Sequence, residues 1–193
     1  NGYLTVVDNL GASSTESFQV IVINRTYHIT WKIASHGLFW QYPQYLDEEE
    51  SIQISREITY CNMTKLIFNL TWDDDIPILG APNDEFMFNV TSPMGPSQEE
   101  SDDDQAISIS FPTSGDMNEV PEDFDMGAET IEALEQILAD MYTSDNGIGE
   151  WEVNITLVDA PGIINGQIDT DEGNDFIMRV SCLYYIPEIT VVD

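Results

Sequence analysis

Three short runs of aspartate are the residues whose chemistry is easiest to name: Asp73 to Asp75, Asp102 to Asp104, and the loop from Asp169 to Asp175. Ca²⁺ takes about six to eight oxygen ligands, and carboxylates clustered on loops supply them. The third run does not fit a helical calcium loop, because Val180 occupies the position of the bidentate glutamate. Solvated acidic turns are the alternative, and the calcium ligands that we expect are Asp73, Asp74, Asp75, Asp169, Asp171 and Asp175.

General acid–base catalysis has few candidates in this sequence. His28 and His36 are the two histidines, and no Gly-x-Ser-x-Gly nucleophile elbow or zinc-ligand spacing occurs. Pairs of carboxylates are unavoidable among 36 acidic residues, so they indicate no particular hydrolase. We therefore expect no catalytic site, and we expect both histidines on the surface.

Cysteines and glycosylation sequons favour export from the cell. Chance placement would give about two Asn-x-Ser/Thr sequons in a chain of this composition. The sequence has five, at Asn24, Asn62, Asn69, Asn89 and Asn154. In an oxidising compartment Cys61 and Cys182 would form a disulfide, with two buried thiols as the alternative. The pattern predicts an extracellular protein that carries N-linked glycans.

The charge excludes two classes of partner. The chain of 193 residues has 36 acidic and 5 basic residues, a formal charge of −31. Nucleic acids and anionic membranes attract clustered Lys and Arg, so we expect neither as a partner. The longest apolar runs are a few residues, so we expect no membrane insertion of this segment. Salt or bound cations must screen such an excess of charge.

The elements that position these residues are mainly strands. Alternation of apolar and polar residues predicts strands over 27–33, 52–60, 66–72, 85–91, 151–157 and 176–185, with a short one at 189–192. In three of these strands the sequon asparagine falls on the polar face. The aromatic segment from Phe39 to Tyr45 is either a ligand platform or packing at one end of the fold.

One helix interrupts the strands. Apolar residues recur at helical spacing between Ala128 and Tyr142, which predicts an amphipathic helix covering an open end or face of the sandwich. We expect an all-β antiparallel sandwich of jelly-roll or immunoglobulin-like type with this helix inserted near 128–142. The sandwich spans 24–193, and residues 1–23 form a separate strand pair.

Residues 4–14, Leu-Thr-Val-Val-Asp-Asn-Leu-Gly-Ala-Ser-Ser, followed by Phe18-Gln-Val-Ile-Val22, resemble the last two strands of a PKD domain. That family is immunoglobulin-like and common in archaeal surface proteins and secreted bacterial enzymes; an ordinary edge hairpin is the alternative. The run Asp84 to Gly95, ending in Ser-Pro-Met-Gly, and the later Gly149-Glu-Trp151 resemble jelly-roll modules of the proprotein-convertase P-domain type and sandwiches of archaeal envelope proteins. Both resemblances imply architecture and a cell-surface setting.

These features together predict a structural or adhesive protein. A lone hairpin is marginally stable in water, so the first 23 residues need further strands. We expect a subunit of an archaeal surface filament or sheath that binds copies of itself by strand exchange, through Leu4, Val6, Phe18, Val20 and Val22. The alternative is a glycan- or calcium-binding sandwich module of a larger secreted protein.

Overall fold

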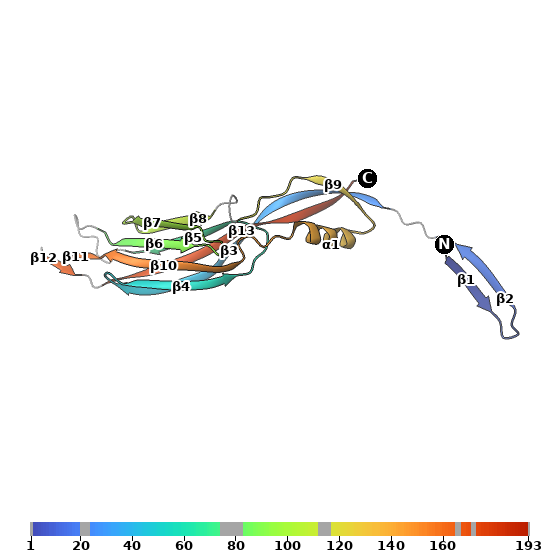
Figure 1. Ribbon diagram of the computed structural model, residues 1–193, viewed down its shortest axis with the longest axis horizontal. Helices are drawn as coiled ribbons and strands as arrows, with labels where there is room; N and C mark the ends of the chain where they lie inside the picture. Colours follow the sequence, from blue (N-terminus) through green and yellow to red (C-terminus); the bar gives the residue numbers. More distant parts are fainter. Residues whose placement is uncertain are drawn as a thin grey trace.

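The computed structural model describes residues 2–19, 24–73, 83–111, 117–164, 167–170 and 173–192. It is an antiparallel β-sandwich with one helix, as the alternation predicts (Figure 1). The strands are β1 (Gly2–Val7), β2 (Ser13–Phe18), β3 (Arg25–Asp47), β4 (Ser51–Ile58), β5 (Met63–Trp72), β6 (Glu85–Thr91), β7 (Ser97–Asp102), β8 (Ala106–Phe111), β9 (Phe124–Ala128), β10 (Gly149–Asp159), β11 (Pro161–Ile164), β12 (Gln167–Thr170) and β13 (Gly173–Val192). The helix α1 is Ile131–Tyr142.

Two sheets form the sandwich. One has the order β4-β10-β6-β7 and the other β8-β5-β13-β3-β9, while β11 and β12 pair with each other and with no other described strand. The acidic segment from Pro96 to Asp125, where the sequence predicts no strand, includes β7, β8 and the start of β9, which all lie at sheet edges. β7 and β9 bury few side chains, which makes their alternation weak, whereas β8 alternates clearly and buries Ile107, Ile109 and Phe111.

Aromatic side chains fill the space between the sheets. The inward residues of β5, β6 and β10 are buried, and the Phe68 and Phe111 rings lie 5.4 and 4.8 Å from that of Trp151. The indole Nε1–H of Trp151 donates to the Gly147 carbonyl at 2.9 Å, so its one polar group is satisfied inside the core. The apolar residues at alternate positions of these strands are therefore the ones that pack between the two sheets.

Strands β3 and β13 are longer than the sandwich and continue beyond it as an arm, in which β9 pairs with the first residues of β3 (Figure 1). The sequence predicts a break in each: an aromatic loop after residue 36, and a gap before residue 189. The prediction of a break near Pro187 is wrong, because a proline at this position removes no hydrogen bond between β13 and β3. Tyr185 donates its N–H to the Asn62 carbonyl, on the side of β13 that faces away from β3. The backbone nitrogen of Pro187, two residues later, lies on the same side, where no described strand pairs with β13.

The arm has its own small core. Tyr27 and Ile29 of β3 and Ala128 of β9 pack with Leu134 and Leu138 of α1. The predicted helix is confirmed, although Ala128 ends β9 and Thr130 is the N-cap, accepting a hydrogen bond from the Ala133 N–H. The helix covers the arm rather than an end of the sandwich (Figure 1).

Strands β1 and β2 form a hairpin whose only sheet partners are each other among the described residues. Asp8 Oδ1 accepts hydrogen bonds from the N–H groups of Leu10 and Ala12, and Gly11 has a φ of 87°, which closes the turn. The predicted second strand, around Phe18 to Val22, is shifted: β2 spans Ser13–Phe18, and residues 20–23 lie outside the described part of the chain.

Candidate functional sites

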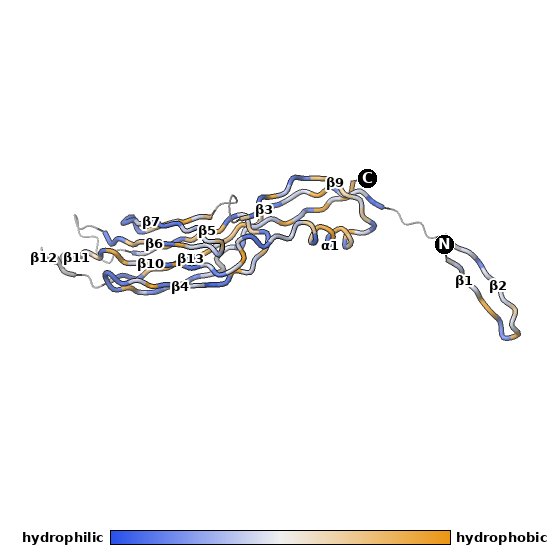
Figure 2. Tube along the Cα trace, in the orientation of Figure 1, coloured by the Kyte–Doolittle hydropathy of each residue, from blue (hydrophilic) through white to orange (hydrophobic). Residues whose placement is uncertain are grey.

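The hairpin exposes apolar side chains on both faces. Leu4 and Val6 are each 62% exposed on one face, and Tyr3 and Val7 are 73% and 61% exposed on the other. The tube view shows β1 and β2 apart from the strands of the sandwich (Figure 2). Of the residues expected to take part in strand addition, Leu4 and Val6 are described in full; the side chain of Phe18, and Val20 and Val22, lie outside the described residues.

A second group of exposed apolar side chains lies on the arm. Ile137 and Met141 of α1 are 38% and 56% exposed, so the helix docks through a narrower stripe than its periodicity predicts. On β13, Ile186, Val191 and Val192 are also exposed, and β5 pairs with β13 only as far as Tyr184. Tyr185 still donates its N–H to the Asn62 carbonyl on this edge, so β13 has one edge without a described strand partner from Ile186 to Val192.

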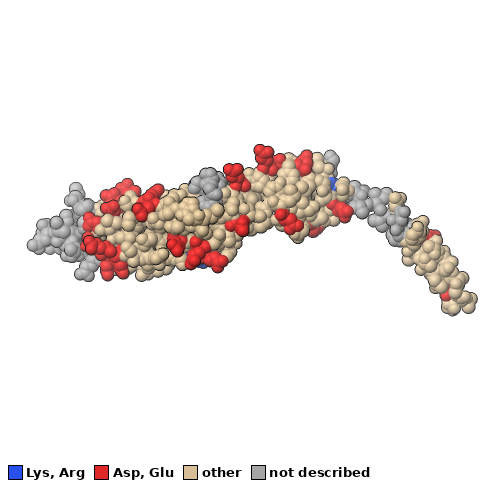
Figure 3. All heavy atoms as spheres, in the orientation of Figure 1, with Lys and Arg blue, Asp and Glu red and all other residues tan. Residues whose placement is uncertain are grey.

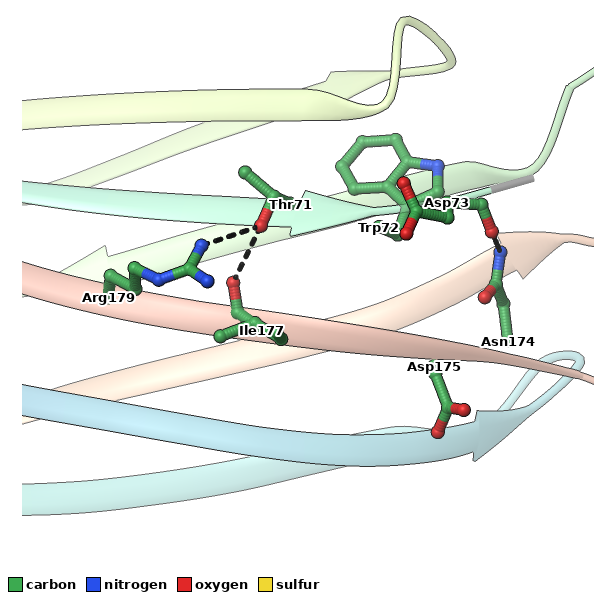
Figure 4. A pocket seen from close by; sticks show the side chains of 7 residues that line it. All are labelled: Thr71, Trp72, Asp73, Asn174, Asp175, Ile177 and Arg179. Carbon is green, nitrogen blue, oxygen red and sulfur yellow. Dashed lines mark hydrogen bonds between the residues drawn. The ribbon is translucent and has the colours of Figure 1, made fainter. Parts of the chain in front are cut away.

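Two of the expected acidic ligands, Asp73 and Asp175, lie together at the end of the sandwich opposite the arm. Asp73 follows β5 and Asp175 lies on β13, and both line a pocket of about 410 Å³ with Thr71, Trp72, Asn174, Ile177 and Arg179 (Figure 4). The buried Asn174 ties the two strands together there: its Nδ2 donates to the Asp73 carbonyl at 2.9 Å and to the Asp84 carboxylate. Asp74, Asp75 and Asp171, and the side chain of Asp169, lie outside the described residues.

Arg179 lies at one end of this pocket and Asp175 at the other (Figure 4). The Arg179 guanidinium donates to the Thr71 hydroxyl at 3.2 Å, and the hydroxyl donates to the Ile177 carbonyl at 3.3 Å. Among the described residues the ion pairs within 4 Å are His28–Asp125 and Lys32–Glu188, so neither aspartate of the pocket pairs with Arg179. Its guanidinium thus keeps donors that no described carboxylate takes, in a chain with very few bases.

The run Asp102 to Asp104 brings three carboxylates within 4.8 Å of one another. It forms the tight turn between β7 and β8, where Asp102 Oδ1 accepts the Asp104 N–H at 2.9 Å. Acidic side chains are exposed over much of the visible surface as well (Figure 3), so a cluster of this kind indicates no particular ion.

The expected disulfide is not formed. Cys61 lies exposed in the loop before β5, whereas Cys182 is buried in the sandwich core, and both are free thiols. Burial raises the pKa of the Cys182 thiol. Burial, and then the nearby Cys61, raise the pKa of the Tyr185 phenol, so Cys61 lies on the Tyr185 side of β13. The two cysteines belong to different environments, which their positions in the sequence do not reveal.

The sequon asparagines have unequal surroundings. Asn24 and Asn154 are exposed, and Asn62, Asn69 and Asn89 are half-buried. Asn89 donates from Nδ2 to Glu99 at 3.1 Å, and Asn62 Oδ1 accepts the Ser144 N–H at 2.9 Å. Asn69, Asn89 and Asn154 all lie on the outer faces of their strands, as expected.

The aromatic segment from Phe39 to Tyr45 belongs to β3 instead of a loop, and it is mostly packing. Trp40 is buried under the Arg56 guanidinium, 5.4 Å from the ring centroid, and Tyr42 packs against the core. Of its described aromatic side chains, Tyr45 alone is largely exposed, at 45%, and it is the register partner of Asp175.

The histidines lie far apart along β3. His28 on the arm is 2.6 Å from Asp125, and His36 lies against Tyr60 with a 3.0 Å hydrogen bond. Both histidines were expected on the surface: His28 lies between the buried Tyr27 and Ile29 and faces outward, whereas His36 is half-buried within the strand.

No known protein family and no curated protein matches this sequence. A solved structure from work on "the promiscuous specificity of the carbohydrate-binding modules from the beta-sandwich super family" aligns with 95% of this chain and 72% of its own, at 13% identity and a TM-score of 0.23. A TM-score this low carries no argument about the site. No helix in the described residues is long and apolar enough to cross a membrane.

Proposed function

We propose that this chain is an extracellular structural or adhesive protein, a subunit of an archaeal surface filament or sheath that assembles by β-strand addition. The observation that carries the proposal is the β1–β2 hairpin, which exposes Leu4 and Val6 without another described strand beside it. Burial of apolar area contributes about 25 cal/mol per Å², and an edge strand offers unpaired backbone groups to a second copy. The open edge of β13 beyond Tyr185 is the acceptor that we propose for it.

Sedimentation velocity and negative-stain microscopy test this assembly. We expect the full chain to form polymers, and a chain without residues 1–23 to remain a soluble sandwich. Val6→Asp should also abolish assembly, because it places a charge on the hairpin ladder. Leu10→Asp is the matched control, since Leu10 is 90% exposed but lies in the turn, and it should assemble normally. Normal polymers from the truncated chain would sink the proposal.

A second candidate function is a glycan- or calcium-binding module of a larger secreted protein. The pocket lined by Asp73 and Asp175 favours it, because it brings two of the expected acidic ligands to one end of the sandwich. For the calcium component we expect Ca²⁺ to raise the melting temperature and Asp73→Asn to remove most of the rise. An unchanged melting temperature between chelator and millimolar Ca²⁺ would eliminate calcium.

A further inference from the structure

The pocket at the acidic end of the sandwich is lined by a hydrogen-bond donor, acceptors and an apolar side chain. Its outer-face residues Arg179, Ile177 and Asp175 lie in a row at alternate positions of β13, with Thr71 beside them on β5 (Figure 4). Donors are concentrated at Arg179 and acceptors at Asp175 and Asp73, and the half-buried Ile177 separates them. A ligand that fits must accept at one end, donate at the other and present an apolar face between.

A simple ion would use only part of this pocket. A divalent cation at Asp73 and Asp175 would leave the Arg179 end unfilled, and an anion at Arg179 would meet a chain of formal charge −31. Sugars carry hydroxyl groups that both donate and accept, together with apolar C–H faces. The volume of about 410 Å³ lies in the range of pockets for small organic ligands.

The length of the row indicates more than one sugar ring. Arg179 and Asp175 are four residues apart on one strand, and a rise of about 3.3 Å per residue separates them by about 13 Å. Two linked pyranose rings span such a distance. Tyr45, across the ladder from Asp175, extends this surface with an exposed aromatic side chain.

We propose that this pocket binds a neutral oligosaccharide of at least two rings, with Arg179 and Asp175 contacting successive rings over Ile177. The inference deepens the second candidate function and is independent of strand addition. The sugar has two sources: a separate glycan, or the chain's own glycan on Asn69, because Asn69 is the register partner of Arg179 on β5. The chemistry is the same for both.

Saturation-transfer NMR and calorimetry test binding, with the full chain produced in a host that does not glycosylate. The probes are neutral di- and trisaccharides of glucose, galactose, mannose and N-acetylglucosamine, with digalacturonate as the charged comparison. We expect at least one neutral probe to bind in the millimolar range or tighter and more strongly than digalacturonate. Arg179→Ala and Asp175→Ala should each weaken it at least about tenfold. The matched control is Arg56→Ala, which removes an arginine from the neighbouring sheet and should bind as the wild type does.

Three outcomes would overturn the inference: no neutral probe binding at millimolar concentration, binding that survives both pocket substitutions, or preference for digalacturonate. Circular dichroism melting of each variant shows whether it is folded, and Asp175→Asn supplies a milder change where the alanine variant is not. Val6→Asp should retain sugar binding, and Arg179→Ala should retain assembly, which separates failure here from failure of the proposed function.

Protein from a glycosylating host distinguishes the two sources. If the chain's own glycan fills the pocket, glycosylated protein will bind the probe weakly and glycosylated Asn69→Gln protein will bind it fully. If a separate glycan is the ligand, both will bind equally. Each result supports the pocket and assigns its occupant.

Discussion

At the scale of single residues, Cys61 and Cys182 differ in solvent access and therefore in reactivity. The thiolate is the reactive form, and burial both shields Cys182 and raises its pKa. We expect iodoacetamide at pH 8 to label Cys61 alone in the native protein, and both residues after denaturation without reductant. Mass spectrometry of the labelled peptides gives the answer. Failure of both to react in the denatured chain would show that the bridge forms after all.

Glycosylation should also follow local surroundings. In protein exported by a glycosylating host, we expect Asn24 and Asn154 to carry glycans at the highest occupancy, because both are exposed. Asn89 should be the least modified, because its Nδ2 is held by Glu99. Glycopeptide mass spectrometry measures occupancy, and Glu99→Gln serves as the variant that weakens the restraint. Higher occupancy at Asn89 than at Asn154 would contradict this reasoning.

At this scale the sequence predicts which face of a strand a side chain lies on, but not which residues of other strands lie next to it. Alternation placed Asn69, Asn89 and Asn154 on outer faces because a strand has a strict period of two. It could not bring Asp73 beside Asp175, since that contact depends on which strands become neighbours in the sheet. The free state of Cys61 was hidden for the same reason.

At the scale of elements, α1 depends on its first turn. Thr130 caps it through a 3.1 Å hydrogen bond, and Thr130→Ala should cost about 1 kcal/mol, while Thr130→Ser should cost much less. Urea unfolding followed by far-UV circular dichroism measures both. Equal stability of the alanine variant and the wild type would show that packing of Leu134 and Leu138 alone holds the helix.

The same turn has a pH dependence of known sign. The Glu132 backbone N–H and the Thr130 hydroxyl lower the pKa of the Glu132 carboxyl. A lowered pKa in the folded state means that Glu132 stabilises the helix above its ordinary pKa, and that this contribution is lost as the pH falls through the lowered value. The far-UV circular dichroism signal of the helix should therefore change less in Glu132→Gln than in the wild type as the pH falls below the ordinary glutamate pKa.

Element type was more predictable than element length. The helix and most core strands follow from periodicity, because their buried faces are continuous. The full lengths of β3 and β13 were missed because Pro43 and Pro187 usually end a strand. Here Pro187 lies where the ladder has no donor to lose, and only the sheet order reveals that.

At the scale of the whole molecule, the charge of −31 should make stability depend on salt. Raising ionic strength from about 0.01 M to about 1 M shortens the Debye length from about 30 to about 3 Å, which screens repulsion among the acidic side chains. We expect the melting temperature to rise by several degrees over this range in NaCl. A flat or falling melting temperature would mean that the acidic groups are already neutralised by bound cations.

The arm also determines how the molecule would respond to a pull. Strands β3 and β13 run antiparallel, and Thr26 pairs with Val192 at the tip, away from the sandwich. A tension applied to these two neighbouring positions would act across the ladder and open it one pair at a time, beginning at the tip. The sandwich would bear no load until the arm had opened, so the arm would unfold before the sandwich under tension.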